Sequence, residues 1–416
     1  MEKSGYNESK TDSACWPSFA WIAVTNRCNL SCTHCQRDQL MQQGLLKPSE
    51  MSWKVFNRLE SEVFPHLRRI QFGGNNFGEQ LSASNWNTFL EKVSKHNIDI
   101  SIVTNGTLLN TNRIKAMVRA GVEINFSLEG ASKESYEAVR AYRFNRFLDI
   151  IKETCEEKTR RPENGAQVNL GYTIFYDNIG EITDLIRMAD RLGVDRVIVT
   201  HFVPWHERQR RQSLVYHKEL SNHMLEKTKQ LARELNIRVD LPRPFRIDDS
   251  QEKPDARERK LAKPCYHPWR SFSINERGDV MPCCATSVVM GNLERSSFSE
   301  IWNGRKYQKL RKTVNSSRPL VFCRDCAFRE IDRESSQPIS FWSDEKFLLA
   351  AIGTEKHLNS SSLLLRKMKN RLKKAKWGEM ALPYLMELYR KHGAFYVTDI
   401  YDICMTPLSK RPSRKR

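Results

Sequence analysis

Three cysteines lie close together near the start of the chain, at Cys28, Cys32 and Cys35. They follow residues 19–24, an apolar, β-prone run that predicts a buried first strand leading into a cysteine-rich loop. Three thiolates on one short loop can hold three irons of a cubane iron–sulfur cluster and leave the fourth iron without a protein ligand. A structural zinc site takes four protein ligands, and this loop supplies three. The spacing therefore favours an iron–sulfur centre with one position open to another molecule.

A second group of cysteines comes much later in the chain, at Cys265, Cys283, Cys284, Cys323 and Cys326. The segment between the first two predicts a β-hairpin that turns at residues 275–278, which brings Cys265 close to Cys283. The C-x-x-C spacing of the last two supplies another pair by local geometry. Four thiolates satisfy one closed site, which would hold either zinc or an iron–sulfur cluster.

The elements between these two groups predict how the first group is positioned. After the first strand, further strands are expected at 67–72, 98–103, 122–128, 167–175 and 196–202, with helices at 85–96, 110–120, 133–140 and 179–192. This alternation is typical of βα units around a parallel sheet. Such sheets carry their chemistry at the carboxyl ends of the strands. Polar residues follow several of the predicted strands there, among them Asn105, Ser127, Glu129 and His201.

Composition sets broader limits on the chain. Its 416 residues predict two to three domains, and 39% hydrophobic residues indicate a globular protein. A net charge of +19 favours anionic partners, although a soluble basic enzyme would have the same composition. No stretch has the apolar length of a membrane span, and residues 1–12 do not resemble a signal peptide. Eleven cysteines without a secretion signal predict metal ligation in a reducing, cytoplasmic compartment.

The cysteine loop resembles the signature of the radical S-adenosylmethionine (SAM) superfamily, with His34 at the aromatic position before the third cysteine. The resemblance implies a [4Fe–4S] cluster held by Cys28, Cys32 and Cys35, whose open iron chelates SAM. One electron, from a donor such as flavodoxin or ferredoxin, then cleaves SAM to a 5′-deoxyadenosyl radical that abstracts hydrogen from the substrate. The predicted βα units match the partial (β/α)6 barrel of this superfamily.

The same resemblance implies further SAM contacts. The family has a Gly-Gly-Glu-Pro-like segment after the second strand. Here it is either residues 73–74 followed by Asn75, or residues 78–81 with Gln80 in place of proline, and the helix register favours the second. In family terms, the SAM-binding residues would then be His34, Gly78, Glu79, Asn105, Ser127, Glu129 and Arg140.

Residues 263–328 resemble the SPASM/twitch domain that follows many radical SAM barrels. The resemblance implies an auxiliary [4Fe–4S] cluster held by Cys265, Cys283, Cys323 and Cys326, with Cys284 as the substitute for Cys283. The seven-cysteine form of the domain needs more cysteines shortly after the C-x-x-C pair, but the next one is Cys404. One auxiliary cluster is therefore expected.

These expectations define an α/β fold: a partial (β/α)6 TIM-like barrel, then a small α+β SPASM/twitch domain and a basic helical tail. The expected divisions are 1–16 as a flexible lead-in, 17–215 as the barrel, 216–262 as a linker, 263–332 as the auxiliary domain and 333–416 as the extension. Basic runs at 366–376 and 410–416 are either solvated or bind an anionic partner or membrane surface.

The leading functional hypothesis is a radical SAM enzyme that oxidises or epimerises a carbon centre in a sugar, aminocyclitol or related small polar metabolite. The reasons are the single expected auxiliary site and a lead-in too short for a peptide-recognition domain. The second hypothesis keeps the chemistry and makes a ribosomal peptide or protein the substrate. The third, from a different class, is a zinc-containing nucleic-acid-binding protein that uses the same cysteines and charge.

Overall fold

The computed structural model describes residues 16–42, 46–73, 77–202, 207–245, 247, 264–286, 288–316 and 318–324. Cys326 and the basic runs at 366–376 and 410–416 lie outside these residues, so the predictions that concern them are not addressed by the structure.

The described residues form one ten-stranded sheet in the order β10-β9-β8-β1-β2-β3-β4-β5-β6-β7. The eight strands from β8 to β7 in this order are parallel, and β9 and β10 are added antiparallel. The strand bounds are β1 Phe19–Ile22, β2 Arg69–Phe72, β3 Asp99–Thr104, β4 Glu123–Leu128, β5 Gln167–Ile174, β6 Arg196–His201, β7 Arg238–Asp240, β8 Ser271–Ile274, β9 Asp279–Met281 and β10 Gly291–Asn292.

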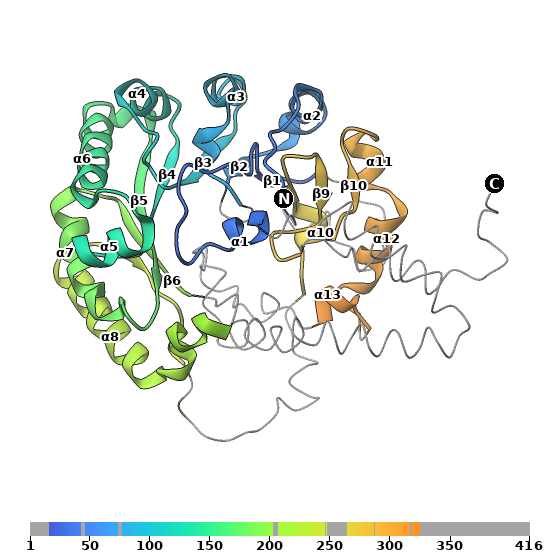
Figure 1. Ribbon diagram of the computed structural model, residues 1–416. Helices are drawn as coiled ribbons and strands as arrows, with labels where there is room; N and C mark the ends of the chain where they lie inside the picture. Colours follow the sequence, from blue (N-terminus) through green and yellow to red (C-terminus); the bar gives the residue numbers. More distant parts are fainter. Residues whose placement is uncertain are drawn as a thin grey trace.

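Helices cover the convex side of this curved sheet, and α1 lies on the concave side (Figure 1). The α-helices are α1 Gln36–Gln42, α2 Trp53–Arg58, α3 Trp86–Val93, α4 Thr111–Arg119, α5 Lys133–Arg140, α6 Phe144–Arg160, α7 Ile182–Leu192, α8 Lys218–Glu234, α10 His267–Arg270, α11 Phe298–Trp302, α12 Arg305–Thr313 and α13 Val321–Arg324. Short 3-10 segments are Phe64–His66, Gln80–Ser82, Pro162–Asn164, Ile179–Glu181, Glu207–Gln212 and Leu214–Tyr216, and a π-helical turn covers Leu59–Val63.

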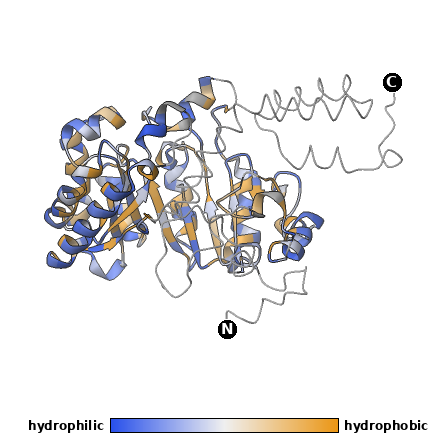
Figure 2. Cartoon of the chain, turned by 90° about the horizontal axis from the view of Figure 1, so that it is seen from below, coloured by the Kyte–Doolittle hydropathy of each residue, from blue (hydrophilic) through white to orange (hydrophobic). Residues whose placement is uncertain are grey.

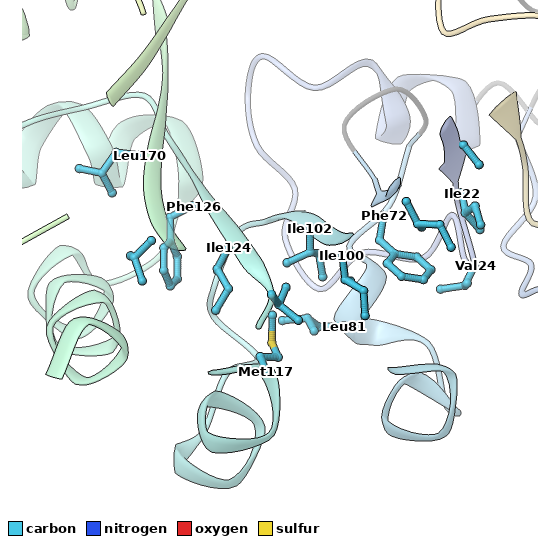
Figure 3. Packing of buried hydrophobic residues seen from close by; sticks show 14 of the residues in the cluster. Ile22, Val24, Phe72, Leu81, Ile100, Ile102, Met117, Ile124, Phe126 and Leu170 are labelled. Atoms are coloured by element: carbon cyan, nitrogen blue, oxygen red, sulfur yellow. The ribbon is translucent and has the colours of Figure 1, made fainter. Parts of the chain in front are cut away.

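The hydrophobic core lies between the sheet and the outer helices. Alternate residues of the strands, such as Ile22, Phe72 and Phe126, are fully buried there, and Met117 of α4 lies in the same cluster beside Leu81 (Figure 3). The strands are therefore mostly hydrophobic, whereas the outer helices carry hydrophilic residues as well (Figure 2). The intervening strand residues face the concave side, where many are polar, as with Ser101 and Asn169. A polar concave side leaves room for a polar ligand at the strand ends.

Local signals in the sequence were sufficient for most of the predicted units. Helix α5 spans 133–140 as predicted, because Ser132 accepts a hydrogen bond from the Ser135 amide and closes a capping box. The segment expected as a linker, 216–262, begins with a helix: α8 covers Lys218–Glu234, and two 3-10 turns precede it. The sequence analysis also missed α6 and the short edge strand β7.

The C-terminal hairpin is part of the same sheet as the barrel strands. β8 and β9 are antiparallel, as the sequence predicted, but β8 also pairs in parallel with β1, residue 19 opposite residue 271. The described C-terminal region is therefore joined to the barrel through a continuous hydrogen-bonded sheet. None of the helices in the described ranges combines the length and apolar character needed to cross a bilayer.

Candidate active site

A cavity of about 380 Å³ opens at the carboxyl ends of the strands on the concave side. Strands β3 to β6, the cysteine loop and the C-terminal end of α5 all contribute to its walls. Every residue that the sequence analysis named for the first centre lines it: Cys28, Cys32, His34, Cys35, Gly78, Glu79, Asn105, Ser127, Glu129 and Arg140. The fold therefore gathers side chains that are up to 112 positions apart into one site.

The cysteine loop is fixed where it leaves β1. The Gln80 side chain, which is fully buried, accepts a hydrogen bond from the Val24 amide at 2.7 Å and donates to the Thr25 carbonyl at 3.2 Å. The amide group of the Gln80 side chain thus makes the hydrogen bonds that a neighbouring strand would make with the backbone just after β1. In the favoured alignment with the family segment, Gln80 is the residue expected in place of proline.

Gly78 and Glu79 brace the loop from the other side. The backbone at Gly78 has φ +106°, and a Cβ there would lie 2.6 Å from the Thr25 carbonyl oxygen, so a larger residue would collide with the chain. The Glu79 amide donates to the Arg27 carbonyl at 2.7 Å. This close approach explains why the segment after β2 needs a glycine.

The buried Glu79 carboxylate connects this segment to the end of β3. It accepts hydrogen bonds from the Thr104 hydroxyl at 2.8 Å and from the Asn105 amide at 2.6 Å. Burial raises the pKa of the Glu79 carboxyl, and these hydrogen bonds oppose the rise. Much of the hydrogen-bonding capacity of Glu79 is therefore used within the protein, although the residue lines the cavity.

Two N–H groups are directed at the first cysteine sulfur. The Leu30 amide lies 3.4 Å from Cys28 Sγ, and Asn105 Nδ2 lies 3.8 Å from it. Asn105 Nδ2 also donates to Asn29 Oδ1 at 3.1 Å, which holds the side chain in place. N–H groups aimed at sulfur stabilise a thiolate and tune iron–sulfur clusters.

Glu129 and Arg140 form a buried ion pair at the cavity wall. Arg140 donates through Nε to one Glu129 carboxylate oxygen and through Nη2 to the other, at 2.8 Å for the second contact. The Glu129 charge raises the pKa of Arg140 against the opposing effect of burial, so the guanidinium stays charged. The backbone amide of Thr33 donates to the Val139 carbonyl at 3.0 Å, which docks the cysteine loop against α5 beside this pair.

An aromatic wall closes another side of the cavity. The His34 ring lies 4.4 Å from the Phe175 ring and 4.8 Å from the Phe202 ring, between centroids. Burial lowers the pKa of His34, so its imidazole is favoured in the neutral form. Phe175 and Phe202 are buried at the ends of β5 and β6, and sequence reasoning did not single them out.

Burial of the three thiols raises their pKa values, so their protonated form is favoured in the absence of a metal ion. Burial raises the pKa of Cys28 and of Cys35, and it raises the pKa of Cys32 to about 12. Arg140 opposes the effect at Cys32 and Arg37 opposes it at Cys28. A coordinated metal deprotonates such thiols outright.

The donor set therefore fits an iron–sulfur cluster. Three cysteines that form no disulfide line one polar cavity, and N–H groups point at one of their sulfurs. In the described ranges, no three Cys, His, Asp or Glu side chains are grouped as ligands of one shared metal ion. A cubane places each thiolate on its own iron, so such a grouping is not required there.

A second, smaller cavity lies in the C-terminal region. Cys265, Cys283, Cys284 and Cys323 all line it, together with apolar residues such as Leu310 and Phe322. Asn315 fixes Cys265 by accepting from its amide at 2.7 Å and donating to its carbonyl at 3.1 Å. The structure thus brings together three of the four expected auxiliary ligands and the substitute Cys284, whereas Cys326 lies outside the described residues.

Thr173 and Arg37 also line the cavity, although the sequence analysis did not single them out. Thr173 and Thr200 are register partners on β5 and β6, and with Ser127 they put a row of hydroxyls on the cavity wall. Arg37 lines the cavity too and donates through Nε to the Asn26 carbonyl at 2.8 Å. Thr173 could have been predicted to line the site, because it lies near the carboxyl end of a predicted strand. Nothing local in the sequence pointed to Arg37.

Family models match both parts of the chain. Residues 22–200 match the radical SAM superfamily, and residues 265–327 match SPASM, an iron-sulfur cluster-binding domain. The chain is a radical SAM enzyme with a SPASM domain. The enzyme uses a [4Fe–4S] cluster with SAM, and the SPASM domain implies auxiliary cluster binding.

Curated relatives extend over most of the enzyme. It is 24% identical over 347 residues to the tungsten-containing aldehyde ferredoxin oxidoreductase cofactor-modifying protein of Pyrococcus furiosus, covering 79% of this chain and 92% of that protein. It is 23% identical over 330 residues to the PqqA peptide cyclase of Gluconobacter oxydans, covering 76% and 84%. A third relative, the antilisterial bacteriocin subtilosin biosynthesis protein AlbA of Bacillus subtilis, is 22% identical and covers 71% of this chain and 61% of its own length.

Solved structures show the same fold. The anSMEcpe structure with bound AdoMet matches with a TM-score of 0.52 at 15% identity, and the match covers 85% of this chain and 96% of that one. SuiB of Streptococcus suis bound to S-adenosylmethionine matches with a TM-score of 0.51 at 15% identity, over 71% of this chain and 66% of SuiB. At this identity the likeness shows the fold alone.

Proposed function

We propose that this radical SAM enzyme modifies a ribosomally made peptide or protein. The observation that carries the proposal is the similarity to the PqqA peptide cyclase and to the subtilosin biosynthesis protein AlbA, which covers 76% and 71% of the chain. These relatives favour the peptide hypothesis over the small-metabolite hypothesis drawn from the sequence. The family assignment leaves the zinc-containing nucleic-acid-binding hypothesis without support.

In this proposal the residues of the first cavity hold the cofactors in fixed positions. Cys28, Cys32 and Cys35 are the cluster ligands, and the cluster with SAM supplies the 5′-deoxyadenosyl radical for hydrogen abstraction. The Arg140–Glu129 pair keeps two opposite charges in place at the cavity wall. Glu79, held by Thr104 and Asn105, keeps the segment after β2 close to the cysteine loop.

The row of hydroxyls on β4, β5 and β6 is available to a bound ligand. The side chains of Ser127, Thr173 and Thr200 have no hydrogen-bond partner among the described residues, although each lines the cavity. A hydroxyl can both donate and accept, so these residues suit a polar group such as a peptide amide. The aromatic wall of the cavity, formed by His34, Phe175 and Phe202, is apolar by contrast. It suits an apolar ring or side chain of the ligand.

The test is co-expression of the enzyme with short peptides encoded beside its gene, followed by mass spectrometry of the peptides. We expect a peptide that changes mass by loss of hydrogen or gains deuterium from labelled solvent, and no change with the Cys32→Ala enzyme. Unchanged peptides from every neighbouring short reading frame would contradict the proposal.

A second candidate substrate class is a small cofactor. The relative from Pyrococcus furiosus, which the chain covers over 92% of its length, is named as a cofactor-modifying protein. Metabolite extracts incubated with the reconstituted enzyme and SAM would show a new product if this candidate is correct.

We further propose a reducing, cytoplasmic setting with a flavodoxin or ferredoxin as the electron donor.

A further inference from the structure

One buried carboxylate in the C-terminal hairpin reaches the start of the cysteine loop. Glu276 lies in the turn between β8 and β9 and is 6% exposed. Its Oε1 accepts a hydrogen bond from Asn26 Nδ2 at 2.9 Å and another from the Ser49 hydroxyl at 2.9 Å. These contacts join residues 250 and 227 positions apart, so they connect the SPASM domain directly to the radical SAM domain.

Asn26 is the point through which Glu276 can act on the loop. It is 2% exposed and lies two residues before Cys28. Its side-chain oxygen accepts from the Ser49 amide at 2.8 Å, and its Nδ2 donates to the Lys47 carbonyl at 2.8 Å as well as to Glu276. Its own carbonyl accepts from Arg37 Nε at 2.8 Å. The polar groups that fix Asn26 therefore come from Arg37, Lys47 and Ser49 of the radical SAM domain and from the hairpin.

The charge of Glu276 is not needed to balance a cation. In the described part of the chain no ion pair to Glu276 occurs, and its partners are a neutral amide and a neutral hydroxyl. Burying a carboxylate costs free energy that neutral donors offset only in part. A carboxylate retained in such a place is best explained by geometry, because one oxygen receives two donors from two different segments.

The surroundings also limit how far Glu276 can move. Gly278 in the same turn has φ +79°, and a Cβ there would lie 2.8 Å from Val55 of α2. The hairpin turn is thus pressed against the radical SAM domain. In the sheet β8 lies between β9 and β1 (Figure 1). Because β8 and β1 are parallel, the turn after β8 and the cysteine loop after β1 leave the sheet at the same end.

We propose that Glu276 is a positioning residue by which the SPASM domain sets the direction of the chain into the Cys28–Cys35 loop. Glu276 is not among the residues that line the first cavity, and it acts through Asn26. The inference is independent of the substrate class proposed above, because it concerns the cysteine loop alone.

The experiment compares three variants of the anaerobically reconstituted full chain by electron paramagnetic resonance, before and after SAM is added to the reduced enzyme. Glu276→Leu removes the acceptor, and Glu276→Gln keeps an oxygen in the same place. Glu294→Leu is the matched control, since Glu294 also lies in the C-terminal region and accepts from a serine of the first domain, Ser52, at 2.8 Å, but at an exposed position.

For Glu276→Leu we expect an altered spectrum of the reduced cluster, a weaker SAM-dependent change and about a tenfold rise in the Kd for SAM. Glu276→Gln and Glu294→Leu should match the wild type. An unchanged SAM-dependent spectrum and Kd in Glu276→Leu would overturn the proposal. An equal change in Glu294→Leu would also overturn it, since it would show a general effect of weakening the domain interface.

Should Glu276→Leu fail to fold, Glu276→Asp takes its place. The shorter side chain keeps the charge but withdraws the oxygen by one methylene, so it cannot serve both donors. We expect the same direction of change in the spectrum and in the SAM Kd, with the wild-type iron content. Wild-type values of both in Glu276→Asp would contradict the positioning role.

Discussion

Some side chains around the cysteine loop are held by buried partners, and their substitution should have larger effects than the substitution of a surface residue. Arg140 and Glu129 are the clearest pair, with side chains 8% and 14% exposed. The charges stabilise each other only while both are present, because a buried charge without its partner is costly.

We predict that Arg140→Met lowers the free energy of unfolding by about 3–5 kcal/mol, since it leaves the Glu129 carboxylate buried without its cation. The double variant Arg140→Met/Glu129→Leu should recover part of this loss. Urea unfolding of the apoprotein measures both. If the losses caused by Arg140→Met and by Glu129→Leu simply added up in the double variant, the two residues would not be coupled and the prediction would be wrong.

His201 gives the molecule a pH-dependent stability. It is 1% exposed, its ring centroid lies 4.5 Å from that of Phe245, and neither ring nitrogen has a hydrogen-bond partner among the described residues. Burial lowers the pKa of His201 to about 3 from an ordinary value of 6.5. Below that ordinary value the unfolded chain binds a proton that the folded chain excludes, so stability is present above it and falls as the pH drops toward 3.

Between pH 7 and pH 5 we therefore expect His201 to remove up to about 2 kcal/mol from the free energy of unfolding. His201→Leu should show a pH dependence that is smaller by this amount, whatever its stability at pH 7. Urea unfolding of both apoproteins at the two pH values gives the difference. Equal pH dependence in the two proteins would mean that His201 is protonated in the folded state.

The elements show which parts of the site a sequence can reveal. Helix α5 was predicted at its true bounds because its signals, Ser132 and Ser135 at the start, are local. The pairing of β8 with β1 and the contact of Glu276 with Asn26 join residues about 250 positions apart. No periodicity or cap records such a contact, so the position of the hairpin against the cysteine loop could not be predicted. Helix α6 was missed although Phe144, Phe147, Ile150 and Ile151 recur at helical spacing, which means that the signal was present.

Gly78 illustrates how the element after β2 serves the site. Gly78→Ala should cost about 1–3 kcal/mol of stability and lower the iron content, because it combines a positive φ with a Cβ only 2.6 Å from the Thr25 carbonyl. Gly165→Ala is the matched control: Gly165 has φ +68° and a Cβ there would meet nothing within 4 Å, so we expect a loss of about 1 kcal/mol and normal iron content. Thermal unfolding and iron analysis after reconstitution compare the two. Similar iron loss in both variants would show that the positive φ alone, and not the contact with Thr25, causes the loss.

At the scale of the whole molecule, the radical SAM and SPASM regions share one sheet. β1 lies between β2 and β8, so its backbone is hydrogen-bonded to both regions. Two domains joined only by a linker would open separately, whereas a shared central strand couples them.

We accordingly predict that β1 and β8 exchange their amide hydrogens together. Hydrogen–deuterium exchange with mass spectrometry, under mild denaturant, should give the same opening free energy for peptides that contain Phe19–Ile22 and Ser271–Ile274. Peptides from the edge strand Arg238–Asp240 should open more easily. If the β8 peptide exchanged at a much lower denaturant concentration than the β1 peptide, the two regions would be independent units.

We infer that the loop of Cys28, Cys32 and Cys35 holds the cluster at which SAM is cleaved. The most direct measurement is the amount of 5′-deoxyadenosine formed by anaerobically reconstituted enzyme with dithionite and SAM. We expect 5′-deoxyadenosine from the wild type and from Cys155→Ala, whose thiol is buried in α6 away from both cavities, and none from Cys32→Ala. No 5′-deoxyadenosine from the wild type, or an equal amount from Cys32→Ala, would contradict the claim.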